Sequence, residues 1–341
     1  MAQQQYAKDQ PAGYKNHVEN IAIVGAGGQV GEYIARALLK TGKHRLTAIS
    51  RADSQSTVPE GIAVKKVDYA KPATLVDALR GQDVLIITMA VTAPPETETK
   101  LIEAAAAAGV PWVLPNEYST DPRNAALQQE TFIGAAKDAA RRRIEELGVS
   151  AWISFTCSFW YEYSLSAGPA SYGFDFPNRT VILYGDGNTK INTTTWLQCG
   201  RAAAALLSLK VLPEDADDRS ATLSRFRNDV LYVSSFRVSQ RDMLASVLRV
   251  TGDREADWTV LHEDVEARYK AGTEEMKTGD RAGFQKMLYS RVFFPNGDGD
   301  FESKYGLHND LLGLPKEDLD EATKRAVDLA AKGGPFAQRR H

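Results

Sequence analysis

The sequence predicts an α/β protein with a Rossmann-type, doubly wound parallel sheet and a smaller C-terminal substrate lobe. Through residue 155, short apolar runs alternate with helical patterns and short connections, which is typical of such a sheet. A glycine-rich turn follows the first apolar run, and beyond Phe155 the alternation gives way to aromatic-rich loops. We expect a flexible tail over residues 1–18, a Rossmann domain over 19–157 and a substrate lobe over 158–341, with segments near 180–235 returning to the sheet.

The first strand, first helix and second strand follow from the residue pattern. Residues 21–24 form a short apolar run suited to a buried parallel strand, and Ile34 and Leu38 lie one helical turn apart after the glycines. A second apolar run occupies residues 46–49. By the same reasoning, the strands are expected near residues 20–25, 45–50, 62–67, 83–89, 111–114 and 150–155, and the helices near 29–41, 72–80, 96–108 and 131–147.

Glycines and caps mark the ends of several elements. Gly109 and Gly148 stand where helix C-caps belong. Ser239 and Asp242 predict a capping box at the start of a helix that stops at Gly252. The other elements expected in the second half are a turn at 185–188, a helix over 196–209, a strand over 230–233 and a last helix over 318–331.

The glycine turn predicts a pyrophosphate site. Glycine lets the backbone turn sharply and approach a phosphate, which the N-terminus of the next helix binds through free N–H groups and its dipole. The spacing is Gly-x-x-Gly-x-x-Gly, which we associate with extended and atypical short-chain reductases, and a turn with a purely structural role is the alternative. The residues expected at the pyrophosphate are Gly25, Gly28, Gln29, Val30 and Gly31.

The end of the second strand favours NADPH over NADH. NAD enzymes usually place Asp or Glu about 20 residues after the glycines, where it binds the ribose hydroxyls. Here the strand ends in Ser50 and Arg51, and the nearest carboxylate, Asp53, lies beyond it. A guanidinium binds a 2′-phosphate that a carboxylate would repel. The alternative is a solvated surface arginine.

Other cofactor contacts are expected where the strands end, because ligands of such sheets bind beyond the carboxyl ends of the strands. Asp68, Met89 and Ala90 follow the third and fourth strands and are expected to border the adenine. Pro115, Asn116 and Phe155 follow the next two strands and are expected near the nicotinamide ribose or ring.

Composition excludes several other classes of protein. The chain has 341 residues, 43% of them hydrophobic, and a formal net charge of −3 without a basic stripe, which disfavours nucleic-acid binding. Its longest apolar stretch, residues 84–91, is too short to span a bilayer, so we expect a cytoplasmic protein with no membrane contact. The two cysteines are too few for a disulfide framework, and no two of the five histidines have the spacing of metal ligands, so no metal site is expected. A homodimer is compatible with the sequence.

Proton transfer requires a donor that the sequence does not supply in the commonest form. Reductases of this kind most often use Tyr-x-x-x-Lys, and here no tyrosine is followed by a lysine four residues later. The best other donor is Lys137, on the helix before the sixth strand, for which simple solvent exposure is the alternative. Partial burial beside a cofactor would lower its pKa from about 10.4, and Arg141 one turn away would act in the same direction.

Residues 137–149 also carry a resemblance to a known family. They are similar to the Lys-x-x-x-Arg-Arg-x-Ile-Glu-x-x-Gly-Ile pattern of isoflavone reductase-like proteins, which belong to the NmrA-like superfamily of atypical short-chain dehydrogenases/reductases. Residues 115–118 resemble the family's Pro-Ser-Glu-Phe turn, 185–188 its Gly-Asp-Gly-Asn turn, and 231–248 its Ser-Gln-containing strand and helix. The similarity extends from residue 20 to about 335.

The resemblance implies roles for two residues and a type of reaction. In these relatives the lysine that matches Lys137 is regarded as the general acid or base, and the arginine that matches Arg51 holds the 2′-phosphate of NADPH. The chain departs from the family after the sixth strand, where Ser-x-x-Cys-Phe is replaced by residues 153–161. This departure makes it unsafe to infer the substrate from the plant enzymes of secondary metabolism.

Aromatic residues beyond the sixth strand predict the substrate class. Flat apolar side chains suit a planar aromatic substrate or cover the nicotinamide, and packing between the lobes is the alternative for each ring. Cys157 is expected to be a small packed residue. The residues expected to contact substrate are Phe159, Trp160, Tyr161, Tyr163 and Tyr172.

These expectations lead to one predicted function and one rival function. The sequence predicts an NADPH-dependent reductase of a small aromatic or conjugated molecule, such as a phenylpropanoid- or isoflavonoid-like compound, ketone, enone or quinone. In this reading Lys137 supplies the proton and NADP+ is the oxidised cofactor. The rival is a non-catalytic NADP(H)-binding redox sensor, a role that other members of the superfamily fill.

Overall fold

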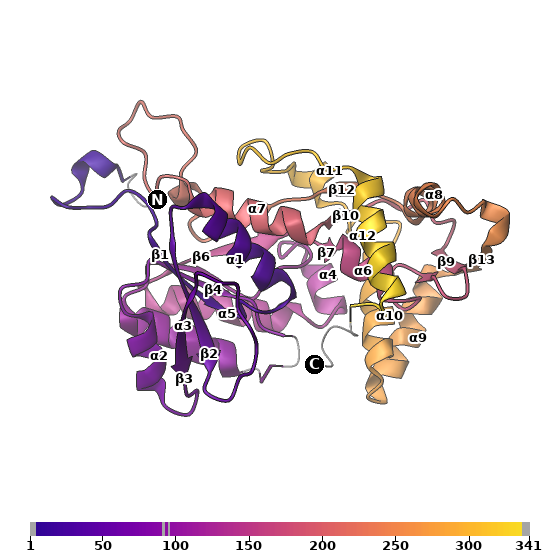
Figure 1. Ribbon diagram of the computed structural model, residues 1–341, viewed down its shortest axis with the longest axis horizontal. Coiled ribbons are helices and arrows are strands. Elements are labelled where there is room, and N and C mark those ends of the chain that lie inside the picture. The colour runs from indigo at the N-terminus through magenta and orange to yellow at the C-terminus, as the bar shows by residue number, and fades with distance from the viewer. Residues whose placement is uncertain (1–4, 91–92, 95, 336–341) are drawn as a thin grey trace.

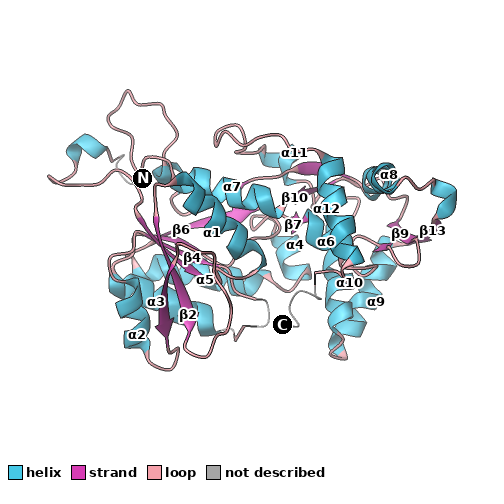
Figure 2. Ribbon diagram, viewed as in Figure 1, coloured by secondary structure: helices cyan, strands magenta, loops and turns pink. Residues whose placement is uncertain are grey.

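The computed structural model describes residues 5–90, 93–94 and 96–335. The molecule is elongated, with a parallel sheet between helices at one end and a lobe rich in helices at the other (Figure 1). Helices flank the sheet on both faces, whereas the strands of the second lobe are short (Figure 2). This is the Rossmann-type α/β fold with a smaller C-terminal lobe that the sequence predicts.

The central sheet is parallel throughout and has seven strands in the order β11-β6-β5-β4-β1-β2-β3. The chain runs outward from β1 in both directions, so the crevice of the doubly wound fold opens beyond β1 and β4. All six predicted strands are present. The strands are β1 (Asn20–Val24), β2 (Arg45–Arg51), β3 (Ala63–Val67), β4 (Val84–Ile87), β5 (Trp112–Leu114), β6 (Ala151–Thr156) and β11 (Asp229–Tyr232).

Helices cover the two faces of this sheet in separate layers. The helices α1 (Gln29–Thr41) and α7 (Trp196–Leu207) pack together over one face. The helices α2 (Pro72–Leu79), α3 (Glu96–Ala108) and α5 (Gly134–Leu147) cover the other. Gly200 allows the close approach of α7 to α1, because a Cβ atom there would lie 2.5 Å from the Tyr33 carbonyl oxygen.

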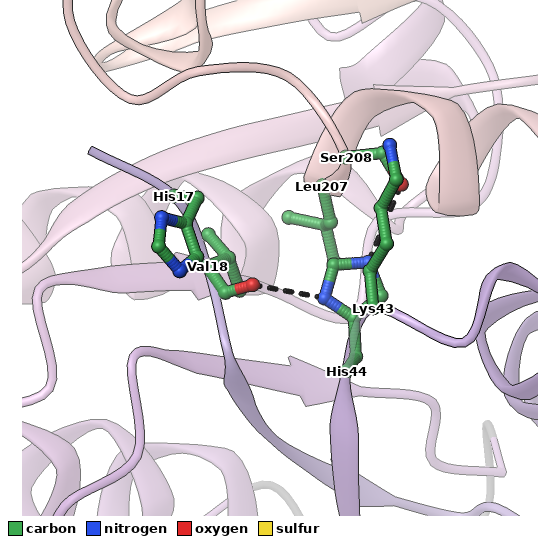
Figure 3. A pocket seen from close by; sticks show the side chains of 6 residues that line it. All are labelled: His17, Val18, Lys43, His44, Leu207 and Ser208. Atoms are coloured by element: carbon green, nitrogen blue, oxygen red, sulfur yellow. Dashed lines mark hydrogen bonds between the residues drawn. The ribbon is translucent and has the colours of Figure 1, made fainter. Parts of the chain in front are cut away.

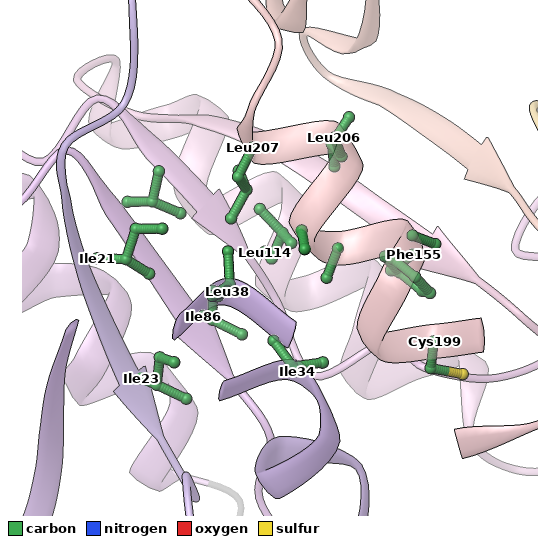
Figure 4. Packing of buried hydrophobic residues seen from close by; sticks show 14 of the residues in the cluster. Ile21, Ile23, Ile34, Leu38, Ile86, Leu114, Phe155, Cys199, Leu206 and Leu207 are labelled. Carbon is green, nitrogen blue, oxygen red and sulfur yellow. The ribbon is translucent and has the colours of Figure 1, made fainter. Parts of the chain in front are cut away.

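Strand alternation explains the two apolar layers. Ile21 and Ile23 of β1 point to the side of α1 and α7, and Ala22 and Val24 point to the side of α2 and α3. Figure 4 shows the first layer, in which the β1 isoleucines face Ile34 and Leu38 of α1 and Leu207 of α7. Each fully buried aliphatic side chain contributes about 1.5–3 kcal/mol, so these two layers fix the position of the strand ends that carry the site.

The helix predicted over residues 131–147 is in fact two helices. A short helix, α4 (Ala125–Glu130), ends at Thr131, and α5 begins only at Gly134. Between them Phe132 has a φ of 59°, a left-handed conformation that interrupts a right-handed helix. The catalytic candidate Lys137 therefore lies near the start of α5.

The second lobe contains two small sheets that the sequence did not predict. One sheet has the order β12-β10-β7 and the other β13-β9-β8. Their strands are β7 (Phe159–Trp160), β8 (Phe174–Asp175), β9 (Thr180–Tyr184), β10 (Ile191–Thr194), β12 (Phe236–Val238) and β13 (Thr259–Glu263). The helices of this lobe are α6 (Tyr161–Ser166), α8 (Gln240–Thr251), α9 (Val265–Lys277), α10 (Arg281–Val292), α11 (Phe301–Tyr305) and α12 (Leu319–Ala331).

The capping signals predicted in the second half of the chain are confirmed. Ser239 and Asp242 form the reciprocal capping box of α8, and Gly252 ends this helix in a left-handed conformation. Asp318 caps α12 rather than beginning it, and α7 ends at Leu207, before the predicted residue 209. Three 3-10 turns complete the fold, at Ala7–Asp9, Leu223–Phe226 and Glu255–Asp257.

Part of the predicted tail is held in place. The Ala7 N–H donates to the Pro213 carbonyl at 2.9 Å, and Asn16 Nδ2 donates to the Leu212 carbonyl at 2.9 Å. Residues 7 and 16 thus contact the segment near residue 213, and the flexible tail stays a prediction. The domain boundaries themselves stay predictions, although β11 does lie beside β6 at the edge of the sheet.

Two kinds of feature are absent from the described residues. None of their helices has the length and apolar character needed to cross a membrane. Within the same ranges, no three His, Cys, Asp or Glu side chains form a group that could hold a metal ion.

Candidate active site

The glycine turn between β1 and α1 is closely packed. Gly25 has a φ of 82°, and a Cβ atom there would lie 2.0 Å from the Thr88 carbonyl oxygen. A Cβ atom on Gly31 would lie 2.1 Å from the Gly25 carbonyl oxygen. Val30, which breaks the commoner glycine spacing, is buried against the core. Gly25 and Gly31 therefore bring the turn, β4 and α1 together, and Val30 anchors the helix.

Gly28 leaves the start of α1 suited to an anion. It is the N-cap residue and provides no side chain to cap the helix. The first N–H groups of a helix and its dipole attract a phosphate when no side-chain oxygen occupies their position. Gln29 Nε2 reaches the Pro335 carbonyl at 3.5 Å, so the described C-terminal end of the chain lies next to this turn. The turn fits the pyrophosphate of a dinucleotide.

Arg51 ends β2 as an exposed cation. Its side chain is 68% exposed and lies 3.5 Å from Asp53, which is 78% exposed. Exposed ion pairs of this kind contribute only about 0–1 kcal/mol, so a doubly charged phosphate could replace Asp53 at little cost. Ser50 is partly buried beside it. Both residues stand where the adenosine ribose of a bound dinucleotide would lie.

A second cation, Lys66, lies beside Arg51 and was not predicted. Ser50 of β2 pairs with Lys66 of β3 in the sheet register. Lys66 Nζ donates to the Ser54 carbonyl at 2.9 Å and to the Arg51 carbonyl at 3.3 Å. It therefore holds the loop after β2 and adds positive charge there. Only the pairing of β2 with β3 reveals this neighbour, because Lys66 is remote from Arg51 in sequence.

Asp68 follows β3 but is engaged within its own loop. Its carboxylate accepts from the Ala70 N–H at 2.9 Å and lies 3.3 Å from Lys71 Nζ. The Ala70 hydrogen bond, followed by the Lys71 contact, lowers the pKa of Asp68. It stays a predicted neighbour of the adenine, at the correct edge of the sheet.

Asn116 joins the ends of β4 and β5. Its Oδ1 accepts from the Met89 N–H at 3.1 Å and its Nδ2 donates to the Met89 carbonyl at 3.2 Å. The Asn116 N–H donates in turn to Glu98 of α3 at 2.8 Å. Pro115 is buried and Ala90 is exposed, and residues 91–92 and 95 lie outside the described ranges. Met89 and Asn116 thus form one rigid unit at the carboxyl edge of the sheet.

Lys137 of α5 lies at the same edge. Its side chain is partly buried, and Nζ donates to the Ser119 hydroxyl. Ser119 forms a bridge with Thr156, the last residue of β6, so the ammonium lies close to the strand ends. Burial lowers the pKa of Lys137 to about 8, although the Glu117 carboxylate opposes this shift. A lysine with this pKa can hold or release a proton near neutral pH.

Arg141, one turn further along α5, binds Glu117. Arg141 Nη1 lies 2.5 Å from Glu117 Oε2, and the same guanidinium contacts Asp138. Glu117 is 2% exposed, and Ser154 Oγ donates to its Oε2 at 2.6 Å. Burial raises the pKa of Glu117 despite this arginine. The Arg141 side chain does not point to water, because it is only 12% exposed.

The predicted aromatic residues separate into two groups. Phe155 is fully buried in the layer between β6 and α7 (Figure 4). It contacts Tyr118, with ring centroids 5.3 Å apart. Tyr161 and Tyr172 are also fully buried and bond to Thr323 and Thr193. For Tyr161 and Tyr172 the predicted substrate contact is corrected to packing in the core, because burial of each ring is complete. Burial of Phe155 likewise argues against the predicted contact with the nicotinamide.

Two other aromatic residues remain accessible. Phe159 is nearly buried and stacks on Tyr289 at 4.0 Å between centroids. Trp160 and Tyr163 are only partly buried and meet Trp196 of α7, with ring centroids 6.4 Å away in each case. Trp196 stacks in turn on Tyr33 of α1 at 5.6 Å. Trp160 and Tyr163 therefore stay the predicted substrate contacts, and Tyr33 and Trp196 extend this aromatic surface.

The two cysteines and one cavity have no assigned part in the predicted chemistry. Cys157 and Cys199 are buried free thiols, and burial raises the pKa of Cys199. A cavity of about 390 Å³ lies among Val18, His44 and Ser208 (Figure 3). His44 and Val18 precede β2 and β1, so the cavity is at the amino edge of the sheet, opposite Lys137.

Comparison with known proteins agrees with this geometry. The sequence profile of the NmrA-like family matches residues 17–167, from the start of β1 to beyond the candidate lysine. Over these residues the chain is similar to the NmrA-like family. The resemblance seen in the sequence is confirmed, and the part that matches contains Arg51, Glu117 and Lys137.

Curated relatives and solved structures extend the similarity over most of the chain. The oxidoreductase AprR of Aspergillus flavus is 26% identical over 307 residues, which are 88% of this chain and 96% of that protein. Quinone oxidoreductase 2 of Escherichia coli is 30% identical over 197 residues, 55% of this chain and 64% of that protein. A crystal structure of isoflavone reductase has a TM-score of 0.70 at 20% identity and covers 90% of this chain and 99% of its own.

Proposed function

We propose that this NmrA-like protein is an NADPH-dependent reductase of a small aromatic or conjugated molecule. The observation that carries the proposal is Lys137, whose ammonium is bonded to Ser119 at the end of β6 and whose pKa burial lowers to about 8. Its position beyond the strand ends is where a bound nicotinamide would meet a substrate. A lysine in this state is suited to donate a proton to a substrate oxygen.

The remaining parts of the site support binding of the cofactor. The uncapped start of α1 at Gly28 suits the pyrophosphate, and Arg51 with Lys66 suits the adenosine 2′-phosphate. NADPH, when bound, supplies the hydride from its nicotinamide C4. An Escherichia coli quinone oxidoreductase with a related fold is known in complex with NADPH, with a TM-score of 0.63 at 20% identity.

Each residue of the proposed mechanism has a separate task. Trp160 and Tyr163 would hold a planar substrate against the cofactor, and Asn116 keeps the ends of β4 and β5 together. Lys137 would give its proton to the oxygen of a carbonyl or leaving group as hydride reaches carbon. Relatives named quinone oxidoreductase 2 and isoflavone reductase homolog support ketones, enones, quinones and phenylpropanoid-like molecules as the class to test.

Turnover with a substrate panel tests this function. The full-length protein is incubated with NADPH and a set of quinones, enones and aromatic ketones, and NADPH oxidation is followed at 340 nm. We expect at least one compound to be reduced, with activity lost in Lys137→Met. Binding of NADPH without oxidation across the panel, together with a partner that distinguishes NADPH from NADP+, would instead favour the redox-sensor alternative.

Cytoplasmic location and a homodimer remain predictions for this chain. Their test is separate from the test of turnover. Sedimentation equilibrium of the purified protein would measure the oligomeric state.

A further inference from the structure

Helix α5 and the loop after β5 are joined by two side-chain contacts one helical turn apart. Lys137 donates to Ser119, and Arg141 donates to Glu117 at 2.5 Å. Residues four apart lie on the same face of a helix, so both cations face one short segment of chain. Glu117 and Ser119 are two residues apart in that segment, so one short stretch of chain binds both cations of α5.

The carboxylate of Glu117 lies in an unusual environment. It is 2% exposed, and within the described ranges its Oε1 has no hydrogen-bond partner. Its Oε2 receives both Arg141 and Ser154. A buried carboxylate with one bare oxygen is costly unless positive charge lies nearby. The Arg141 charge is shared with Asp138, so the balance of the cluster requires the second cation, Lys137.

We propose that Glu117 is a positioning residue for the reaction, whose buried carboxylate is the counter-charge that keeps the Lys137 ammonium charged and bonded to Ser119. The relevance of this role to turnover rests on the proposed function. Glu117 acts through Lys137 and touches neither substrate nor cofactor.

Several other groups face Lys137 and must be included in the charge balance. Glu98 approaches from α3, Cys157 from the segment after β6 and Arg141 from α5 itself. Of these influences on the pKa of Lys137, burial is the largest and lowers it, Glu117 is next and raises it, and Arg141 follows and lowers it. Glu117 is therefore the largest single influence among the charged neighbours of the lysine.

Direct measurement of the Lys137 pKa tests the role without using activity. Full-length protein is labelled with 13Cε-lysine, the Lys137 signal is assigned with Lys137→Met, and its chemical shift is titrated in each variant. We expect Glu117→Gln to lower the pKa of Lys137 by about one unit, since it removes the anion that most raises this pKa. The alkaline limb of kcat/KM should move down by the same amount.

A matched control separates this effect from general damage. Glu103 of α3 also pairs with an arginine of α5, Arg143, but on an exposed surface. Glu103→Gln should therefore leave the pKa of Lys137 unchanged. Far-UV circular dichroism and NADPH affinity check that each variant is folded.

A double variant keeps the proposal testable if Glu117→Gln does not fold. Glu117→Gln with Arg141→Gln removes one charge of each sign, and loss of a whole buried pair is tolerated better than loss of one partner. We expect its Lys137 pKa to stay within about half a unit of wild type, because the two removed influences oppose each other. If Glu117 had no influence, loss of Arg141 alone would raise that pKa.

The outcomes distinguish this inference from the proposed function. A Lys137 pKa within about 0.2 units of wild type in Glu117→Gln, or a raised pKa in the double variant, would overturn the role of Glu117. Retention of turnover by Lys137→Met would overturn the proposed function, yet the chemical-shift titration would still decide whether Glu117 holds the lysine.

Discussion

Arg51 and Lys137 are both cations beyond the carboxyl ends of the same parallel sheet, yet their surroundings are opposite. Arg51 is 68% exposed and its ion-pair partner Asp53 is exposed too. Lys137 lies beside a buried carboxylate, and burial lowers its pKa to about 8. An exposed guanidinium remains charged and free to exchange one anion for another, whereas a desolvated ammonium can give up its proton.

The comparison shows how one edge of the sheet can separate binding from proton transfer. At the Arg51 end, exposure suits recognition of a phosphate from solvent. At the Lys137 end, Glu117, Arg141 and Ser154 form a fixed buried network around the lysine. Substitutions at the two ends should therefore change different kinetic constants.

The largest effect is expected from removal of the buried lysine. Lys137→Met should lower kcat by about 10²–10⁴-fold, the usual contribution of a general acid, while the dissociation constant of NADPH stays near wild type. Lys40→Met, at the exposed end of α1, is the matched control and should keep full turnover. Equal loss of NADPH binding and of turnover in Lys137→Met would contradict a role in proton transfer, because it would make the lysine a binding residue.

The second-largest effect is expected from substitution of the exposed Arg51. Arg51→Glu replaces the phosphate-binding cation by an anion and should lower the preference for NADPH over NADH by about 100-fold, or about 2.7 kcal/mol. The measurement is kcat/KM with each cofactor at saturating substrate. Equal changes with both cofactors would show that Arg51 does not contact the 2′-phosphate.

A smaller effect is expected at Lys66. Lys66 lies beside Arg51 and donates hydrogen bonds to the Ser54 and Arg51 carbonyls. It should therefore act mainly by holding the loop after β2 and by its charge. Lys66→Met should raise the KM for NADPH about two- to fivefold and reduce its dependence on salt. Lys66→Arg should restore the salt dependence, and an unchanged KM in Lys66→Met would remove this residue from the site.

The sequence predicted those parts of the fold that depend on local chemistry. Alternating strand residues placed β1 between two apolar layers, and Ser239 with Asp242 marked the start of α8. Short strands such as β7 and β8 have two residues each and therefore no readable period. Phe132, whose left-handed conformation divides α4 from α5, carries no signal in its residue type.

The candidate site was predictable in part for a related reason. Arg51 and Lys137 were found because motifs and spacing mark them, and the structure places both at the carboxyl edge of the sheet. Lys66 depends on the register of β3 against β2, and Glu117 depends on its burial, which sequence does not show. The same limit applies to Tyr161 and Tyr172, whose position in the core follows from tertiary packing.

The pH dependence of kcat/KM tests the central claim most directly, because it reports the proton that Lys137 must carry. Since the donor has to be protonated, kcat/KM should be level below its pKa and fall tenfold per unit of pH above about 8. Lys137→Arg, which cannot lose its proton in this range, should abolish this limb along with most of the rate. A wild-type profile that stays level to pH 10 would contradict the assignment of Lys137 as the acid.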